Sequence, residues 1–156
     1  MSNKYSKLEA ALRSTRLNAV NEITAGERSG TDVIACEELL PEWTKKGPKG
    51  DGSHEVGEPC TYNGQAWKCC QAHNTNNNPD IVPGAYPAHW APYHTTDPAK
   101  AKPFIQPTGA HDSYLTGEVC LWTDGAVYRS IMETANAYSP ADYAAGWEVV
   151  EEGGGA

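Results

Sequence analysis

Cysteine and histidine side chains are the first residues of this sequence that could do chemistry. Cys69, Cys70 and His73 lie close enough along the chain to suggest a zinc site, because thiolates and imidazoles are preferred zinc ligands. Adjacent cysteines lack the two-residue spacing of the usual zinc motifs, so we expect no metal and no cofactor. The five cysteines cannot all pair within one chain, and no secretory signal supports a disulfide framework. We interpret them as reduced and mostly buried.

Carboxylates are the second group that could react. The chain has 20 Asp and Glu residues, but no pair of them sits in a recognised catalytic motif. The sequence also contains no G-x-S-x-G, H-E-x-x-H or phosphate-loop pattern. A catalytic cleft needs a larger core than the short units described below can build. We therefore expect no catalysis by this chain.

Aromatic rings are the third and largest group. Of the 14 aromatic residues, 13 lie after residue 42, whereas Leu, Ile, Val and Phe together number only 21 of 156 residues. Such a low aliphatic content makes a thin core, which large buried rings must supplement. The folded part of the chain is therefore expected after residue 42.

The charge of the chain limits its partners. Twelve basic residues against 20 acidic residues give a formal net charge of −8, and no basic cluster exceeds Lys45, Lys46 and Lys49. Nucleic acid and anionic membranes are therefore not expected as partners. We also expect neither membrane insertion nor secretion, because no apolar run approaches the ~20 residues that span a bilayer and no signal-peptide pattern is present. Synthesis in a cytoplasm follows from this interpretation.

An internal repeat organises the aromatic part of the chain. Residues 57–68 align with residues 117–129 through the pattern G-E-x-C-x-aromatic, a glycine turn and an aromatic-basic pair, with one insertion. Residues 83–90 match residues 140–147 without a gap. Each match has three shared anchors, so the sequence predicts a duplicated unit.

Each copy of the repeat is predicted to form a β-hairpin. In the first copy the strands are residues 59–62 and 65–71, which flank an Asn-Gly pair, the favoured two-residue hairpin turn. In the second copy the strands are about 118–122 and 126–132. A proline-rich loop and a final short strand with a tryptophan follow each hairpin.

The predicted fold class is mainly β: two small, three-stranded, aromatic-rich β-modules in tandem, preceded by an N-terminal helical segment. Units of this size are too small for a two-sheet sandwich, so aromatic packing must stabilise them. We expect a helical attachment or oligomerisation segment, a first module, a stiff linker, a second module and a tail, at residues 1–40, 41–94, 95–103, 104–150 and 151–156.

The N-terminal segment has the pattern of an amphipathic helix from about residue 6 to residue 23. Its apolar stripe consists of Leu8, Leu12, Ala19 and Ile23. A second short helix is predicted over residues 32–40, with Thr31 or Asp32 as the N-cap. The stripe has two alternative partners. It either docks on the chain's own modules or mediates self-association and attachment to a larger assembly.

The anchors of the first copy carry a family resemblance. They are a leading tryptophan, a G-E turn, Y-N-G, an aromatic residue followed by Lys and Cys, a histidine and a closing proline and tryptophan, at Trp43, 57–58, 62–64, 67–69, His73, Pro83 and Trp90. This pattern resembles the type 3 chitin-binding domain, which comprises carbohydrate-binding modules of families 5 and 12. Residues 102–147 look like the second copy of a tandem arrangement found in small phage and prophage virion proteins. The resemblance covers about residues 41–150.

The resemblance implies recognition by flat aromatic faces that stack on sugar rings, without catalytic groups. In the family, the main stacking aromatic lies two residues before the loop proline. This position is Tyr138 in the second copy, but it is Ile81 in the first, which departs from the family pattern. The candidate sugar-binding residues are Tyr138, Tyr143, Trp122, Tyr62 and Tyr86.

Several of these residues also have a purely structural interpretation. Packing is the alternative for Tyr86 and Tyr143, and the set expected in the core is Trp43, Trp67, Trp90, Trp122, Tyr128 and Trp147. His73 and His111 are interpreted as residues that fix loops by hydrogen bonds.

The sequence therefore predicts a non-enzymatic virion accessory protein on the tail, baseplate or head of a phage, which displays its modules to host or environmental glycans. The expected partners are a polysaccharide or glycan, other virion proteins and further copies of the chain, and the expected location is the virion surface. One alternative is a purely structural capsid decoration or cement protein with a decayed sugar site. Another is an accessory module of a chitinase-like enzyme.

Overall fold

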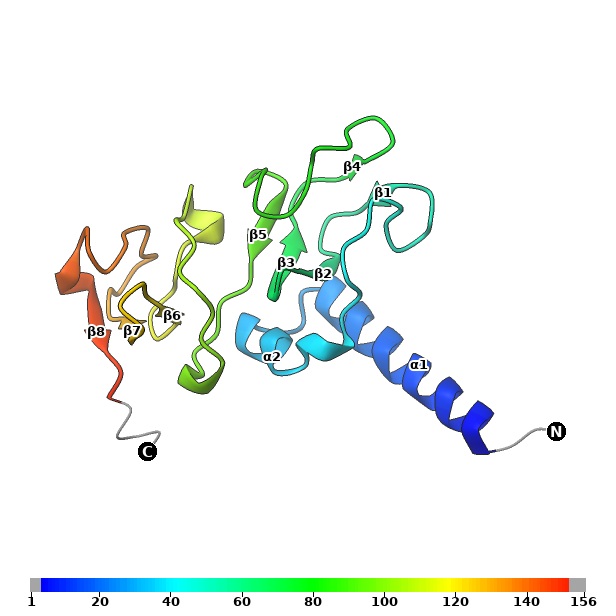
Figure 1. Cartoon of the computed structure of the whole chain (residues 1–156), viewed down its shortest axis with the longest axis horizontal. Helices are drawn as coiled ribbons and strands as arrows, with labels where there is room; N and C mark the ends of the chain where they lie inside the picture. Colours follow the sequence, from blue (N-terminus) through cyan, green and yellow to red (C-terminus); the bar gives the residue numbers. More distant parts are fainter. Residues whose placement is uncertain (1–3, 152–156) are drawn as a thin grey trace.

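Three small antiparallel β-sheets follow an N-terminal helix in the computed structural model, which describes residues 4–151 (Figure 1). The predicted tail at residues 151–156 lies outside the described part except for Glu151. The mainly β class with a helical N-terminus is confirmed. None of the helices in residues 4–151 has the length and apolar character needed to cross a bilayer.

The first sheet has the strand order β2-β3-β5, with β2 at Pro59–Tyr62, β3 at Gln65–Cys69 and β5 at Trp90–Pro92. Asn63 and Gly64 connect β2 to β3 with φ angles of +51° and +77°. Positive φ at both central residues defines the type I′ turn, whose twist matches that of the two strands. The predicted hairpin is confirmed, although β3 ends two residues earlier than expected.

The second sheet has the order β6-β7-β8, with β6 at Val119–Leu121, β7 at Val127–Ser130 and β8 at Trp147–Val149. Its hairpin turn uses Gly125 at a φ of +84°. A third sheet of two strands pairs β1 at Ser53–His54 with β4 at His73–Asn74. The sequence did not predict this third sheet.

The same hydrogen bond between a glutamate side chain and a backbone amide precedes the first strand of both larger sheets. The Glu58 carboxylate accepts a 2.7 Å hydrogen bond from the amide of Glu55, and the Glu118 carboxylate accepts one of 2.7 Å from the amide of Leu115. Each of these turns has a glycine at positive φ just before the glutamate. The G-E pattern of the sequence therefore marks a repeated local structure.

Helix α1 spans Lys4–Thr24 and extends away from the sheets at its N-terminal end (Figure 1). Of its predicted stripe, only Ala19 and Ile23 are buried, whereas Leu8 and Leu12 are 56% and 48% exposed. The C-terminal part of the stripe therefore docks on the rest of the chain, whereas its N-terminal part is exposed to solvent.

The second predicted helix differs from the observed one. Helix α2 spans Gly30–Ala35, and Ser29, not Thr31 or Asp32, is its N-cap, because the Ser29 hydroxyl accepts a hydrogen bond from the Asp32 amide. A separate 3₁₀ turn covers Glu37–Leu39. Gly30 lies so close to the carbonyl of His94 that a β-carbon would clash. This contact leaves room only for glycine at the first position of the helix, and the local pattern gave no sign of it.

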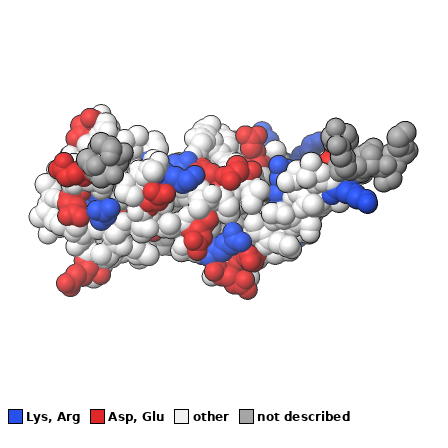
Figure 2. Space-filling model, turned by 90° about the horizontal axis from the view of Figure 1, so that it is seen from below, with Lys and Arg blue, Asp and Glu red and all other residues white. Residues whose placement is uncertain are grey.

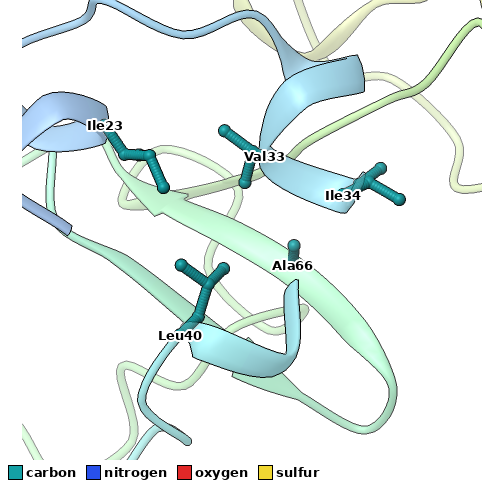
Figure 3. Close-up of a cluster of buried hydrophobic side chains, with 5 residues drawn as sticks. All are labelled: Ile23, Val33, Ile34, Leu40 and Ala66. Carbon is teal, nitrogen blue, oxygen red and sulfur yellow. The ribbon is translucent and has the colours of Figure 1, made fainter. Parts of the chain in front are cut away.

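A buried apolar cluster joins the N-terminal segment to the first sheet (Figure 3). Ile23 comes from α1, Val33 and Ile34 from α2, and Leu40 from the following turn, and they pack around Ala66 of β3. Val33, Ile34 and Ala66 are fully buried. The expected boundary at residue 40 therefore does not coincide with a break between hydrophobic clusters.

The segment between the two larger sheets, at residues 95–103, contacts the rest of the chain. Thr95 is buried and pairs with Val119 of β6. Lys102 donates hydrogen bonds to the Glu37 carboxylate at 2.7 Å and to the carbonyl of Gly64 at 3.0 Å. These contacts attach the linker predicted at residues 95–103 to both the helical segment and the first sheet.

Candidate functional site

Two exposed tyrosines form the candidate site in the loop before β8. The side chains of Tyr138 and Tyr143 are 52% and 43% exposed, and their ring centroids lie 5.5 Å apart at an interplanar angle of 64°. Large aromatic side chains at this exposure are typical of interaction surfaces. The two rings thus lie next to each other in an edge-on contact, and both are partly exposed to solvent.

A buried asparagine holds the backbone beneath this pair. The side chain of Asn136 is fully buried, and its amide nitrogen donates to the Ser130 hydroxyl at 3.1 Å and to the Gly146 carbonyl at 3.2 Å. Its amide oxygen accepts a 3.0 Å hydrogen bond from the backbone nitrogen of Tyr138. The indole of Trp147 donates to the carbonyl of the same tyrosine at 3.0 Å. These hydrogen bonds fix the backbone at Tyr138.

Tyr143 is supported by a glycine. A β-carbon at Gly146 would lie 2.9 Å from Cδ2 of Tyr143 and 3.2 Å from the side chain of Met132. The absence of a side chain at this position lets the tyrosine ring lie against the backbone. Rings held in this way lose little conformational entropy when they bind a ligand.

The equivalent loop before β5 lacks this pair. Ile81 occupies the position that corresponds to Tyr138, and it is only 7% exposed because it packs against Trp67 and Trp90. Tyr86, which corresponds to Tyr143, is 39% exposed and touches His89 edge-on. The first loop therefore has one exposed tyrosine where the second has two.

The remaining candidates, Tyr62 and Trp122, lie at the ends of β2 and β6. Both are half-buried. The ring of Tyr62 meets Trp43 edge-on at 5.6 Å, and the ring of Trp122 meets Phe104 edge-on at 5.3 Å. Among the aromatic rings of residues 4–151, neither these two nor Tyr86 contacts the Tyr138 and Tyr143 pair. The structure brings two of the five sequence-predicted site residues together.

No protein-family model matches this chain, and no curated protein matches it significantly. The chemistry of the chain must therefore be judged from its own residues.

The core aromatics divide into buried and partly buried residues. Trp67, Trp90 and Trp147 are buried, as expected from the sequence. The remaining three, Trp43, Trp122 and Tyr128, are half-buried.

The two histidines predicted to fix loops do so. A ring nitrogen of His73 lies 2.8 Å from the Gln71 carbonyl, and one of His111 lies 3.0 Å from the Pro87 carbonyl.

The sequence did not predict that three imidazoles, those of His54, His73 and His89, lie together. His54 stacks on His73 at 4.9 Å, and His89 meets His73 edge-on at 5.2 Å. Burial and the neighbouring His73 lower the pKa values of His54 and His89. The pairing of β1 with β4 creates this group, because it places His54 directly opposite His73.

The cysteines behave as small apolar side chains. Cys60, Cys69 and Cys120 are free and buried, and burial raises the pKa values of the Cys69 and Cys120 thiols to about 12. Protonated thiols are poor nucleophiles and poor metal ligands. Cys69 lies 4.0 Å from His73, whereas the thiol of Cys70 points to the Lys68 carbonyl. Residues 4–151 contain no group of three or more His, Cys, Asp or Glu side chains placed to hold a metal ion.

Proposed function

We propose that this chain is a non-enzymatic accessory protein of a phage virion, which displays carbohydrate-binding modules to host or environmental glycans at the tail, baseplate or head surface. The observation that carries the proposal is the exposed pair of Tyr138 and Tyr143, held from below by Asn136 and Trp147. The CH faces of a pyranose are apolar and slightly positive, so they pack on such rings. The sugar hydroxyls remain free to bond to the rim of the site.

The rim offers hydrogen-bonding groups of the kind that sugars use. The amide of Gln106, which is exposed, donates to the Ala137 carbonyl at 2.8 Å and so lies beside the loop that carries Tyr138. Asp142 is exposed next to Tyr143. An apolar platform with a few polar groups at its edge is the usual composition of a sugar site.

Two tandem modules at about residues 41–94 and 104–150 are part of the proposal. The two larger sheets have the same strand order. In both, the first strand pairs with a preceding residue through an isolated parallel β-bridge, which joins Glu42 to Thr61 in one sheet and Pro103 to Leu121 in the other. These correspondences support a duplication and agree with the resemblance to tandem chitin-binding modules. Stacking at the loop position is assigned to the second module, because Ile81 is buried in the first.

The N-terminal part of α1 is proposed to attach the protein to other virion proteins or to further copies of the chain. Leu8, Leu12 and Leu17 are exposed on this helix. A groove of about 400 Å³ between α1 and the segment at residues 38–41 continues this surface, with Leu17 and Leu39 among its lining residues. Several copies on one particle would raise the avidity of a weak individual stacking site.

The charge distribution agrees with a ligand other than nucleic acid. Acidic and basic residues are interspersed on the face shown in Figure 2, without a broad basic patch. Nucleic-acid binding depends on such patches to neutralise phosphates.

The glycan part of the proposal is tested by binding of the full chain to chitin, peptidoglycan and host-surface polysaccharide. Tyr138→Ala should weaken binding about tenfold, which corresponds to ~1.4 kcal/mol. Leu115→Ala is the matched control. Leu115 is an apolar residue in the turn before β6, and it is about as exposed as Tyr138. Absence of binding by the wild-type chain to all three polymers would refute glycan recognition.

The burial of Ile81 favours one alternative, a decoration or cement protein whose sugar sites have decayed. Under this alternative the chain would stabilise a particle without binding any glycan, and Tyr138 would be covered in the particle. Protection of Tyr138 from chemical modification on assembled particles distinguishes the two functions. The accessory module of a chitinase-like enzyme has no specific structural observation in its favour.

A further inference from the structure

A second aromatic hollow lies where the first hairpin meets the chain leading to the second sheet. It has a volume of about 220 Å³ and is lined by Tyr62, Trp67, Pro83, Gly84, Pro103 and Ile105, together with the residues of the hairpin turn. Pro103 and Ile105 come from the stretch before β6, so the hollow exists only because the two halves of the chain pack together.

We propose that this hollow is a second carbohydrate subsite that takes one neutral pyranose ring. The inference rests on the proposed function but concerns a different surface from the Tyr138 and Tyr143 pair. It assigns sugar binding to the first half of the chain, although that half carries Ile81 at the loop position.

The aromatic residues of the hollow are held in place. The indole nitrogen of Trp67 donates a 3.3 Å hydrogen bond to the carbonyl of Tyr62. The edge contact of Tyr62 with Trp43 fixes its ring, which remains half-exposed. Pro83 and Pro103 add rigid apolar walls. A half-exposed ring of fixed orientation between apolar walls suits the CH face of a sugar.

The size of the hollow limits its occupant. Pockets for drug-sized ligands measure about 300–1,000 Å³, and this hollow is smaller. It therefore suits one ring of a glycan chain whose other rings stay in solvent. A proline-rich peptide is less suited, because such peptides require a groove with several consecutive aromatic pockets.

The chemistry of the lining favours a neutral ligand. The lining residues are all uncharged. The nearest cation, Lys102, is occupied by the Glu37 carboxylate and the Gly64 carbonyl. The amide side chain of Asn63, which is exposed at the hairpin turn, can exchange hydrogen bonds with sugar hydroxyls. An anionic glycan would gain no charged partner here.

Two tryptophan indole signals can report on the two sites separately in NMR. The indole N–H of Trp67 bonds to Tyr62, and the indole N–H of Trp147 bonds to Tyr138. We would titrate the full-length chain with the soluble trimer of N-acetylglucosamine. Both indole signals should shift to saturation, and the Trp67 shift should persist in Tyr138→Ala.

Variants at Tyr62 provide the reciprocal test. Tyr62→Ala should abolish the Trp67 shift and leave the Trp147 shift intact, whereas Tyr62→Phe, which keeps the ring, should retain both. A Trp67 signal that stays fixed while the Trp147 signal shifts would overturn the second subsite and leave the proposed function standing. So would a Trp67 signal that responds to a proline-rich peptide but not to the trimer. If neither signal responds to this trimer, to peptidoglycan fragments or to host-surface polysaccharide, the proposed function fails as well.

Discussion

The contribution of the N-terminal segment to the first sheet can be measured by truncating one buried side chain. Ile34 of α2 is fully buried against Val33, Leu40 and Ala66. Removing three carbons from a buried isoleucine costs about 2–5 kcal/mol, and we expect about 3 kcal/mol for Ile34→Ala because the short helix α2 can relax around the cavity. A loss of this size should lower the melting temperature by about 6–12 °C in a chain of this length.

Leu8→Ala is the matched control for this measurement. It removes the same number of carbons from a side chain that is 56% exposed on α1, so we expect a change within about 0.5 kcal/mol. Urea unfolding followed by tryptophan fluorescence is a suitable assay, because Trp67 and Trp90 belong to the first sheet. If Ile34→Ala destabilised the chain no more than Leu8→Ala, the helical segment would be energetically separate from the sheet, contrary to the packing in Figure 3.

Three further predictions concern pH, a turn and the N-terminal part of α1. His94 stacks on Tyr114, and burial lowers the pKa of its imidazole to about 4. In the unfolded chain the same imidazole takes up a proton below about pH 6.5. The free energy of unfolding should therefore be at its full value above that pH and fall by about 1–3 kcal/mol towards pH 4. His94→Phe should flatten this slope in urea titrations at several pH values. Gly64→Ala should cost about 1–2 kcal/mol in thermal unfolding, because φ is +77° there while the added carbon meets no atom within 4 Å. Deleting residues 1–15 should convert an oligomer seen by sedimentation into monomer and leave the unfolding midpoint of the monomer unchanged. An intact oligomer would exclude the N-terminal part of α1 as the contact.

The hairpins could be predicted because their determinants are local. The turn at Asn63 and Gly64 needs positive φ at both positions, and these two residue types tolerate it best. Alternation on either side then sets the strands to within about two residues. The tyrosine pair was partly predictable for a similar reason, since Tyr138 precedes a loop proline in the pattern of the resembled family.

Features that depend on contacts between distant residues could not be predicted. Only glycine fits at the first position of α2, because the carbonyl of His94, 64 positions further along the chain, lies against Gly30. The strands β1 and β4 have two residues each, too few to produce a periodic pattern. The amphipathic stripe of α1 did not reveal that only its C-terminal part would be covered.

The two copies of the repeat differ in how they use the loop before the last strand. In the second copy, Trp147 bonds to the carbonyl of Tyr138, and the tyrosine ring is free to face solvent. In the first copy, the indole nitrogen of Trp90 is buried without a hydrogen-bond partner, while Ile81 fills the space against its ring. An unpaired buried donor costs about 1–3 kcal/mol, and burial of an isoleucine contributes a comparable stabilisation. The first loop therefore gains apolar packing where the second retains a hydrogen bond and an exposed ring.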